Sequence, residues 1–234
     1  MKKFELTSET KINIFGKKLF RIKALISFAD VEAGETGGWV EKEGNVNQSG
    51  DAWVYGNAEV YGNAWVSGNA KVSGNAWVSG NAIVYGDAMV SGNAWVSGNA
   101  KVYGNAKVSG NAWVSGNAIV YGDAMVSGNA EVSGNAKVYG NAMVSGNAMV
   151  SGNAIVSGDA MVSGDADYTT IHGFGTQFRT TTFFRCKDKK VRVACGCFFG
   201  TIPEFREQVK NTRKGKIAEE YLMIADLMEK HFEK

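Results

Sequence analysis

The chain has 234 residues, of which 44% are apolar, and it holds 30 glycines and one proline. This apolar content excludes a disordered chain, and the single proline excludes collagen. With 25 Lys and Arg against 23 Asp and Glu, the chain lacks the basic excess of a nucleic-acid or anionic-membrane binder. Nucleic acid is therefore not an expected partner.

The first ten residues, MKKFELTSET, carry the basic residues of a signal peptide but no apolar stretch after them. No run approaches the roughly 18 apolar residues that span a bilayer. The three cysteines are an odd number and do not indicate a disulfide framework. We therefore expect a cytoplasmic protein without membrane contact, with a place in a virion as the alternative.

Residues 1–51 predict an N-terminal β cap. Two strands, 11–15 and 19–24, are expected to form a hairpin around the turn 16–18, because Ile12 and Ile14 alternate with polar residues on the first strand. Residues 33–40, AGETGGWV, then lead into the first coil. A cap is needed there because the open strand edge of a solenoid recruits other chains.

From residue 52 to 165 the chain is one hexapeptide, Ala-x-Val-(Ser/Tyr)-Gly-(Asn/Asp), in 19 copies without a gap. Ala and Val are two residues apart, so on an extended segment they share a face, and x points the other way. Gly and Asn then fill the bend, since these residues most readily accept a positive φ. Each copy thus predicts a short strand whose Ala and Val become buried only when coils stack.

The spacing of the aromatic residues predicts the size of a coil. Like residues recur every 18 positions: Tyr85, Tyr103, Tyr121 and Tyr139 in one series, and Trp77, Trp95 and Trp113 in another. Eighteen residues are three hexapeptides, so the coil should be three-sided, with like side chains directly above one another. We expect a mainly β fold, a parallel β-helix of about six coils over residues 52–166, about 30 Å long. Tyr55 and Tyr61 do not follow this register.

One corner of the expected triangle alternates in charge. Successive coils place there Asp51, Asn69, Asp87, Asn105, Asp123, Asn141 and Asp159. Stacked backbones lie about 4.8 Å apart, and aspartates at that spacing would repel one another. Duplication of a 36-residue unit explains the origin of the pattern, because residues 68–94 and 104–130 are identical. Low repulsion explains why the pattern persists.

The repeat resembles the hexapeptide-repeat left-handed β-helix, whose signature is an aliphatic residue followed four positions later by a small one. Val54 with Ala58 and Val60 with Ala64 fit this signature, as do the copies that follow. The left hand is implied by the resemblance alone. Residues 33–40, followed by Gly50-Asp51-Ala52-Trp53-Val54-Tyr55, resemble the YdcK-type β-solenoid proteins.

Residues 167–234 differ in composition, with 13 Lys and Arg against 9 Asp and Glu. Strands are expected at 180–186 and 191–199, joined by a turn at 187–190. A capping box of Thr201 and Glu204 predicts a helix to about Lys210, and a second helix is expected over 217–232. This ββαα segment resembles the C-terminus of phage and prophage solenoid proteins of unknown function, through Thr-Thr-Thr-Phe-Phe at 180–184 and Cys-Gly-Cys-Phe at 195–198.

The resemblance also raises the question of catalysis, since many hexapeptide β-helix proteins are acyltransferases with a catalytic histidine or carbonic anhydrases with three zinc-binding histidines. This chain has two histidines, His172 and His231, and both lie outside the repeat. His172 is a weak candidate for a general base, and an ordinary surface histidine is the alternative. His231 is interpreted as a solvated residue of the last helix.

Cys186, Cys195 and Cys197 do not predict a metal site, because the Cys-x-Cys spacing is tighter than that of structural zinc sites and a fourth ligand is lacking. We expect reduced thiols packed under the two helices. Neither a Gly-x-Gly-x-x-Gly motif nor a P-loop is present, and no cofactor is predicted.

The outward columns are the remaining candidates for a functional site. Trp77, Trp95 and Trp113 are expected to form a flat aromatic ladder, and methionines, among them Met89, Met125 and Met143, occupy another face. Contiguous apolar patches mark contact sites. Packing against a terminal segment or a symmetry mate is one interpretation, and stacking on sugars or bases is another.

These observations favour a non-catalytic scaffold or interaction protein of phage or prophage origin. It would self-associate, as a trimer by the family resemblance, and present a repetitive side-chain surface to a host or phage protein. Two alternatives stay open: a hexapeptide-type acyltransferase, and a carbohydrate-binding module that uses the Trp ladder.

Overall fold

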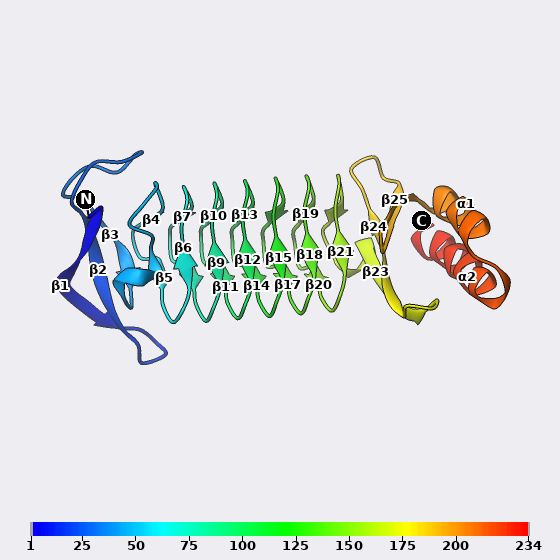
Figure 1. Ribbon diagram of the computed structural model, residues 1–234, viewed down its shortest axis with the longest axis horizontal. Helices are drawn as coiled ribbons and strands as arrows, with labels where there is room; N and C mark the ends of the chain where they lie inside the picture. Colours follow the sequence, from blue (N-terminus) through cyan, green and yellow to red (C-terminus); the bar gives the residue numbers. More distant parts are fainter. Residues whose placement is uncertain (1, 234) are drawn as a thin grey trace.

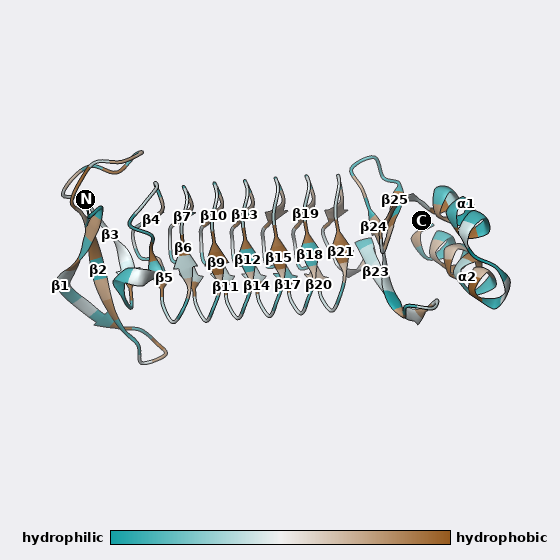
Figure 2. Cartoon of the chain, in the orientation of Figure 1, coloured by the Kyte–Doolittle hydropathy of each residue, from teal (hydrophilic) through white to brown (hydrophobic). Residues whose placement is uncertain are grey.

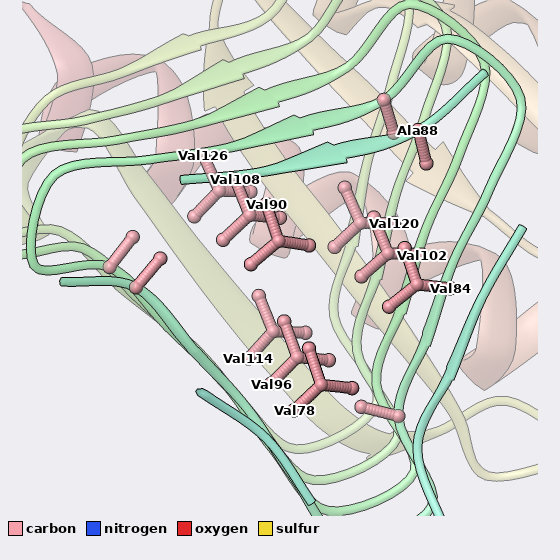
Figure 3. Close-up of a cluster of buried hydrophobic side chains, with 14 of the residues drawn as sticks. Val78, Val84, Ala88, Val90, Val96, Val102, Val108, Val114, Val120 and Val126 are labelled. Carbon is pink, nitrogen blue, oxygen red and sulfur yellow. The ribbon is translucent and has the colours of Figure 1, made fainter. Parts of the chain in front are cut away.

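The alanines and valines of the repeat form the core of the molecule. A computed structural model describes residues 2–233, and the inner Ala and Val of every copy are buried. Figure 3 shows three stacks of valine facing one another across the interior, one from each side of the coil. A single turn could not bury these side chains, so stacking of the coils creates the core.

The repeat folds into three parallel sheets that form the sides of a prism (Figure 1). The Trp face contains β5 (Glu59–Val60), β8 (Trp77–Val78), β11 (Trp95–Val96), β14 (Trp113–Val114), β17 (Glu131–Val132) and β20 (Met149–Val150). The Met face contains β4 (Trp53–Val54), β7 (Lys71–Val72), β10 (Met89–Val90), β13 (Lys107–Val108), β16 (Met125–Val126), β19 (Met143–Val144) and β22 (Met161–Val162). The Ile–Lys face contains β6 (Trp65–Val66), β9 (Ile83–Val84), β12 (Lys101–Val102), β15 (Ile119–Val120), β18 (Lys137–Val138) and β21 (Ile155–Val156).

The register of 18 residues is confirmed on all three faces. Trp95 pairs with Trp77 and Trp113, and Lys101 pairs with Ile83 and Ile119. The hydropathy colouring of Figure 2 follows the Ile–Lys face, where Ile-Val strands such as β9 and β15 are separated by the Lys-Val strand β12. The three-sided parallel β-helix is therefore present as expected.

Inter-coil hydrogen bonds give the stack a direction. Backbone amides at the x, Ser/Tyr and Asn/Asp positions donate to Ala, Val and Gly carbonyls of the next coil. Three such N···O distances are 2.9 Å for Trp77 to Ala94, 2.9 Å for Ser79 to Val96 and 2.7 Å for Asn81 to Gly98. The first coil is consequently left with carbonyls that need donors, and the last coil with amides that need acceptors.

The N-terminal cap consists of β1 (Phe4–Ile12), β2 (Lys18–Ala24) and β3 (Thr36–Val40), with a short 3-10 helix, η1 (Glu43–Asn45). The first strand, expected at 11–15, is correct only for Lys11 and Ile12: β1 begins earlier, at Phe4, and residues 13–17 form the turn. Asn13 Oδ1 accepts from the amides of Phe15 and Lys17 at 3.0 and 2.9 Å, and this local turn competes with a longer strand.

Strand β3 begins the solenoid before the repeat does. Trp39 and Val40 pair in parallel with Glu59 and Val60, and Val46 bridges to Val66. This turn of irregular sequence lies above the first hexapeptides, and with it the solenoid has about seven turns.

Side chains from both caps bind the exposed ends of the stack. At the N-terminal end, Lys3 Nζ donates to the carbonyls of Ala52 at 2.8 Å and Gly50 at 3.1 Å. At the C-terminal end, Thr182 Oγ1 accepts from the amide of Ile155 at 3.0 Å. The caps therefore supply donors to one end and acceptors to the other, as the direction of the stack requires.

The C-terminal segment, which begins after a 3-10 helix, η2 (Asp165–Asp167), contains four strands and two helices. These are β23 (Tyr168–Phe174), β24 (Arg179–Arg185), β25 (Val191–Cys195), β26 (Phe198–Thr201), α1 (Ile202–Thr212) and α2 (Gly215–Phe232). The expected ββαα order was incomplete: β23 was not predicted, and the expected strand 191–199 is divided by a turn at Gly196, where φ is +62°. The capping box of Thr201 and Glu204 is confirmed.

The four-stranded sheet lies between the solenoid and the two helices (Figure 1). Phe184, Cys186 and Ala194 join the core of the solenoid, whereas Phe183 and Val193 pack with the apolar stripes of α1 and α2. The alternation of side chains along β24 and β25 therefore seals the last coil with one face and holds the helices with the other.

Candidate interaction surface

Four stacked tyrosines follow one corner of the prism. This Tyr corner, between the Ile–Lys and Met faces, consists of Tyr85, Tyr103, Tyr121 and Tyr139. Successive ring centroids are 4.7, 5.0 and 4.8 Å apart, with interplanar angles of 8°, 8° and 15°. Tyr103 thus lies between Tyr85 and Tyr121, as the 18-residue register requires, and burial raises the pKa of Tyr103 and Tyr121. The ring faces are occupied by one another, which leaves ring edges and hydroxyls outward.

Alternating Asn and Asp run beside the tyrosines. Asn69 Nδ2 donates to Asp87 Oδ1 at 2.9 Å, and Asn105 donates to Asp123 at 2.8 Å. The last pair, Asn141 and Asp159, lies at 3.2 Å. A carboxylate has no hydrogen to pass on to the next coil, so this column consists of separate Asn–Asp pairs. Asp87, Asp123 and Asp159 are each held by an amide, and the next carboxylate in the column is two coils away.

The other two corners carry continuous asparagine ladders. Asn81 Nδ2 donates to Asn99 Oδ1 at 2.9 Å, and Asn99 donates in turn to Asn117 at 2.9 Å. Each asparagine therefore donates downward and accepts from above, because its amide carries both a donor and an acceptor. These ladders extend the hydrogen bonding of the backbone to the prism edges.

The Trp face does not form a flat ladder throughout. Trp95 and Trp113 are parallel within 3° at 5.0 Å, but Trp77 stands at 80° to Trp95. The cause is Phe15 in the turn of the N-terminal hairpin, whose ring centroid lies 5.7 Å from those of both Trp77 and Trp95. A terminal segment therefore packs against the first rungs, and Trp113 is left 43% exposed.

Phe15 is the contact residue of this face that sequence reasoning missed. It was expected in a strand, and no periodicity links it to Trp77 and Trp95, which lie far along the chain from it. The ring remains half exposed, so it covers the tryptophans and also enlarges the apolar surface that they present.

The Met face carries methionines in register with lysines. Met89 and Met125 are each 37% exposed, and Lys107 lies between them in the sheet. Met143 is half-buried and pairs with Met125 on the side away from Lys107. Unbranched thioether side chains adapt to many partner shapes, so this face is suited to contact without defining one ligand.

His172 lies on β23 and lines a shallow surface pocket together with Asn153 and Ile155 of the last coil. It is exposed, and its Nδ1 is 3.2 Å from Thr180 Oγ1. The second histidine, His231, lies at the end of α2, where its ring contacts Phe232 at 5.0 Å. The structure brings neither side chain to the Trp face, the Met face or the Tyr corner.

The expectation that all three thiols pack under the helices is wrong. Cys186 is buried against the last coil, and burial raises the pKa of its thiol to about 11. Cys195 is half-buried near the helices, and Cys197 is exposed in the β25–β26 turn. The strand alternation around β24 and β25 distributes the cysteines over different environments.

Residues 2–233 contain no group of three or more His, Cys, Asp or Glu arranged to hold a metal ion. No helix in the same range is both long and apolar enough to span a bilayer.

Comparison with protein families supports the repeat. Seven segments of the chain match the YdcK β-solenoid repeat: 52–68, 70–86, 84–98, 100–116, 112–128, 136–150 and 144–158. No curated protein has significant similarity to the chain. All matched segments fall within the hexapeptide coils, so the matches and the parallel stacking agree: the central part of this protein is a β-solenoid whose repeats are similar to the YdcK β-solenoid repeat.

Proposed function

We propose that the protein is a non-catalytic interaction solenoid, of phage or prophage origin, that associates with copies of itself and presents its faces to a protein partner. The observation that carries the proposal is the registry of exposed columns along an uninterrupted stack: Trp113 on the Trp face, Met89 and Met125 on the Met face, and Tyr85 at the Tyr corner are all more than a third exposed. Solenoids commonly bind partners through such repeated surfaces.

The caps support contact through the sides of the prism. Lys3 binds the carbonyl end of the stack, and Thr182 binds the amide end. Because both ends have cap residues on them, end-to-end pairing of coils is opposed. The long faces are then the surfaces that a second molecule can reach.

The spacing of charge supports a second copy as one such molecule. Lys101 and Lys137 are 36 residues apart on the Ile–Lys face, and Asp87, Asp123 and Asp159 have the same spacing beside the Tyr corner. Among residues 2–233, none of these five forms an ion pair within the chain. Positive and negative columns of equal period can pair at several points when two copies lie side by side.

The experiment is the oligomeric state measured by multi-angle light scattering. We expect the wild type to associate, with a trimer as the order implied by the family resemblance, and Trp113→Ser to weaken the association at least tenfold. Leu227→Ser is the control, because Leu227 is also exposed, at 59%, but lies on α2, outside the faces of the solenoid. A monomeric wild type, or an unaltered Trp113→Ser oligomer, would contradict the proposal.

The two alternatives have weaker support. Sugars stack on open ring faces, whereas the faces of Trp95 and Trp113 are turned toward each other. An acyltransferase needs a base at the donor site, and His172 lies beside Thr180 on an exposed strand. Saturable binding of acetyl-CoA by calorimetry, or of a glycan on an array, would favour one of these alternatives over the interaction solenoid.

A further inference from the structure

The C-terminal domain contains a small pocket at the edge of its sheet. The β23–β24 turn, the β25–β26 turn, the last turns of α1 and Tyr221 of α2 surround a cavity of about 120 Å³. One water molecule needs about 10–15 Å³ on the same measure. The cavity can therefore hold several waters or one small ligand.

Two arginines that lack carboxylate partners line this pocket. The C-terminal domain has five arginines, and three of them pair with acids: Arg185 with Asp167, Arg192 with Asp188, and Arg206 with Asp226 and Glu229. Among residues 2–233, Arg179 and Arg213 have no ion pair, and both line the cavity. No Asp or Glu is among the lining residues. The pocket thus concentrates positive charge that the chain does not neutralise.

The turns are shaped to hold these side chains. Gly196 has φ +62°, and a Cβ at that position would overlap Nη1 of Arg179. The guanidinium therefore lies across the β25–β26 turn, in space that only glycine leaves open. Tyr221 donates its hydroxyl to the carbonyl of Phe174 at 3.2 Å on the opposite side.

Both arginines act on Tyr221, which lies in the wall of the same cavity. Burial raises the pKa of Tyr221, and the charges of Arg213 and Arg179 act in the opposite direction. Because Arg179 and Arg213 both line this cavity, an anion inside it lies in the field of both guanidiniums. The side-chain amides of Gln177 and Gln208 in the lining can donate further hydrogen bonds, whereas the hydroxyl of Thr212 donates to the carbonyl of Gln208 at 2.6 Å.

We infer that this pocket binds a phosphate group, held between the guanidiniums of Arg179 and Arg213. Guanidinium forks match the paired oxygens of phosphate and favour it over a single point charge such as chloride. The inference is independent of self-association, because the pocket lies in the C-terminal domain and uses no residue of the solenoid faces.

Isothermal titration calorimetry with inorganic phosphate, at ionic strength held constant with chloride, tests the inference. We expect saturable binding to the full-length protein and at least a tenfold weaker Kd for Arg179→Gln and Arg213→Gln. Lys210→Gln is the matched control: it removes the same charge from exposed α1 surface outside the pocket. Absence of saturable binding by the wild type, or equal weakening by Lys210→Gln, would overturn the proposal.

A second measurement needs no variant. Cys197 is exposed and lines the pocket, so bound phosphate should slow its alkylation by iodoacetamide, followed by mass spectrometry. An unchanged rate at saturating phosphate would count against the site. Comparison with O-phosphoserine separates the sources of the ligand: tighter binding of phosphoserine indicates a phosphate carried by a larger molecule, and tighter binding of inorganic phosphate indicates the free anion.

Discussion

At the scale of single residues, the glycine of each repeat meets two separate constraints. Gly98 has φ +66°, a left-handed conformation that costs other residues roughly 1–2 kcal/mol. Its missing Cβ also leaves room for the next coil, because a Cβ there would lie 2.9 Å from the carbonyl oxygen of Gly116. Gly152, in the same column, has the same φ but no atom within 4 Å of a Cβ.

Substitution of these two glycines separates the cost of the backbone conformation from the cost of disturbing the stacked coils. We expect Gly152→Ala to cost about 1 kcal/mol, since only the backbone conformation is affected. Gly98→Ala should cost at least about 1 kcal/mol more, because the stacked backbone has to move. Urea denaturation followed by circular dichroism gives both values, and equal losses would show that the coils yield without resistance.

The asparagine ladders permit a second comparison between columns. Asn99→Asp removes the hydrogen bond donated to Asn117 but keeps the one accepted from Asn81, at a cost of about 1 kcal/mol. Asn105→Asp would instead place three carboxylates on successive coils, at 87, 105 and 123. Repulsion between neighbours about 4.8 Å apart adds about 1 kcal/mol each in water.

We therefore expect Asn105→Asp to be the more destabilising change, and to recover partly in 1 M salt or below about pH 4, where Asp is protonated. Thermal unfolding at two salt concentrations measures the difference. A melting temperature of Asn105→Asp that does not respond to salt would show that repulsion plays no part in the alternation.

At the scale of elements, the N-terminal cap depends on a buried lysine. Lys3 is 2% exposed and spans the carbonyls of Gly50 and Ala52. Burial lowers the pKa of Lys3 from 10.5 to about 8, against the opposing attraction of Asp51. The charged form is thus disfavoured in the folded state, whereas a neutral amine keeps both hydrogen bonds.

Because the pKa of Lys3 is lower in the folded protein than in the unfolded chain, the free energy of unfolding depends on pH. Between pH 8 and 10.5 the unfolded chain binds the proton that folded Lys3 has released, so stability rises with pH in this window. We expect the wild type to gain up to about 3 kcal/mol relative to Lys3→Met across it. Lys2→Met, at the exposed neighbour paired with Glu43, should leave the pH profile of the wild type intact. If the difference in free energy of unfolding between wild type and Lys3→Met did not change with pH, burial would not lower the pKa of Lys3 as described.

Much of the fold could be predicted from the sequence because its hydrogen bonding repeats with the hexapeptide. Ala and Val fix the inner face, Gly fixes the bend, and the spacing of like residues such as Tyr85 and Tyr103 fixes the number of sides. Beyond the repeat, the alternation of apolar and polar residues predicts strands less clearly. Strand β23 was missed, and the turn at Gly196 was hidden inside an apolar run.

The candidate surface was only partly predictable, for a different reason. The alignment of side chains in a column follows from the 18-residue period. The tilt of the Trp77 ring, however, depends on its contact with Phe15 of the N-terminal cap. The phosphate pocket likewise joins Arg179 at the start of β24 to Arg213 at the end of α1. Contacts between elements that share no period are set by tertiary packing, and one sequence alone carries little signal of them.

At the scale of the whole molecule, the solenoid has a direction, because the backbone amides at the x, Ser/Tyr and Asn/Asp positions donate toward the next coil and its two ends therefore differ chemically. Its carbonyl end is bound by donors such as Lys3, and its amide end by acceptors such as Thr182. Beneath Thr182, the apolar face of β24 also covers the last coil through Phe184. The caps therefore satisfy the strand edge and cover the open end of the core.

Removal of residues 167–234 should convert the last coil into a binding edge. The amide of Ile155 would lose Thr182 Oγ1, and the interior near Val156 and Val162 would face water. We expect concentration-dependent association of the truncated protein in sedimentation velocity, beyond the order reached by the full chain. Thr182→Val, which removes the acceptor but keeps the cap, is expected to lower the melting temperature without this association.

Association through the open end can be separated from association through the sides. Trp113 lies on the Trp face, two coils before the last strand of that sheet, so Trp113→Ser should weaken side-by-side contacts and leave end-to-end growth of the truncated protein unchanged. If the truncated protein instead keeps the oligomeric state of the full chain, water alone must satisfy the exposed backbone amides of the last coil. The C-terminal segment would then be unnecessary for blocking the stack, and its role would have to be sought in its own pocket rather than at the end of the solenoid.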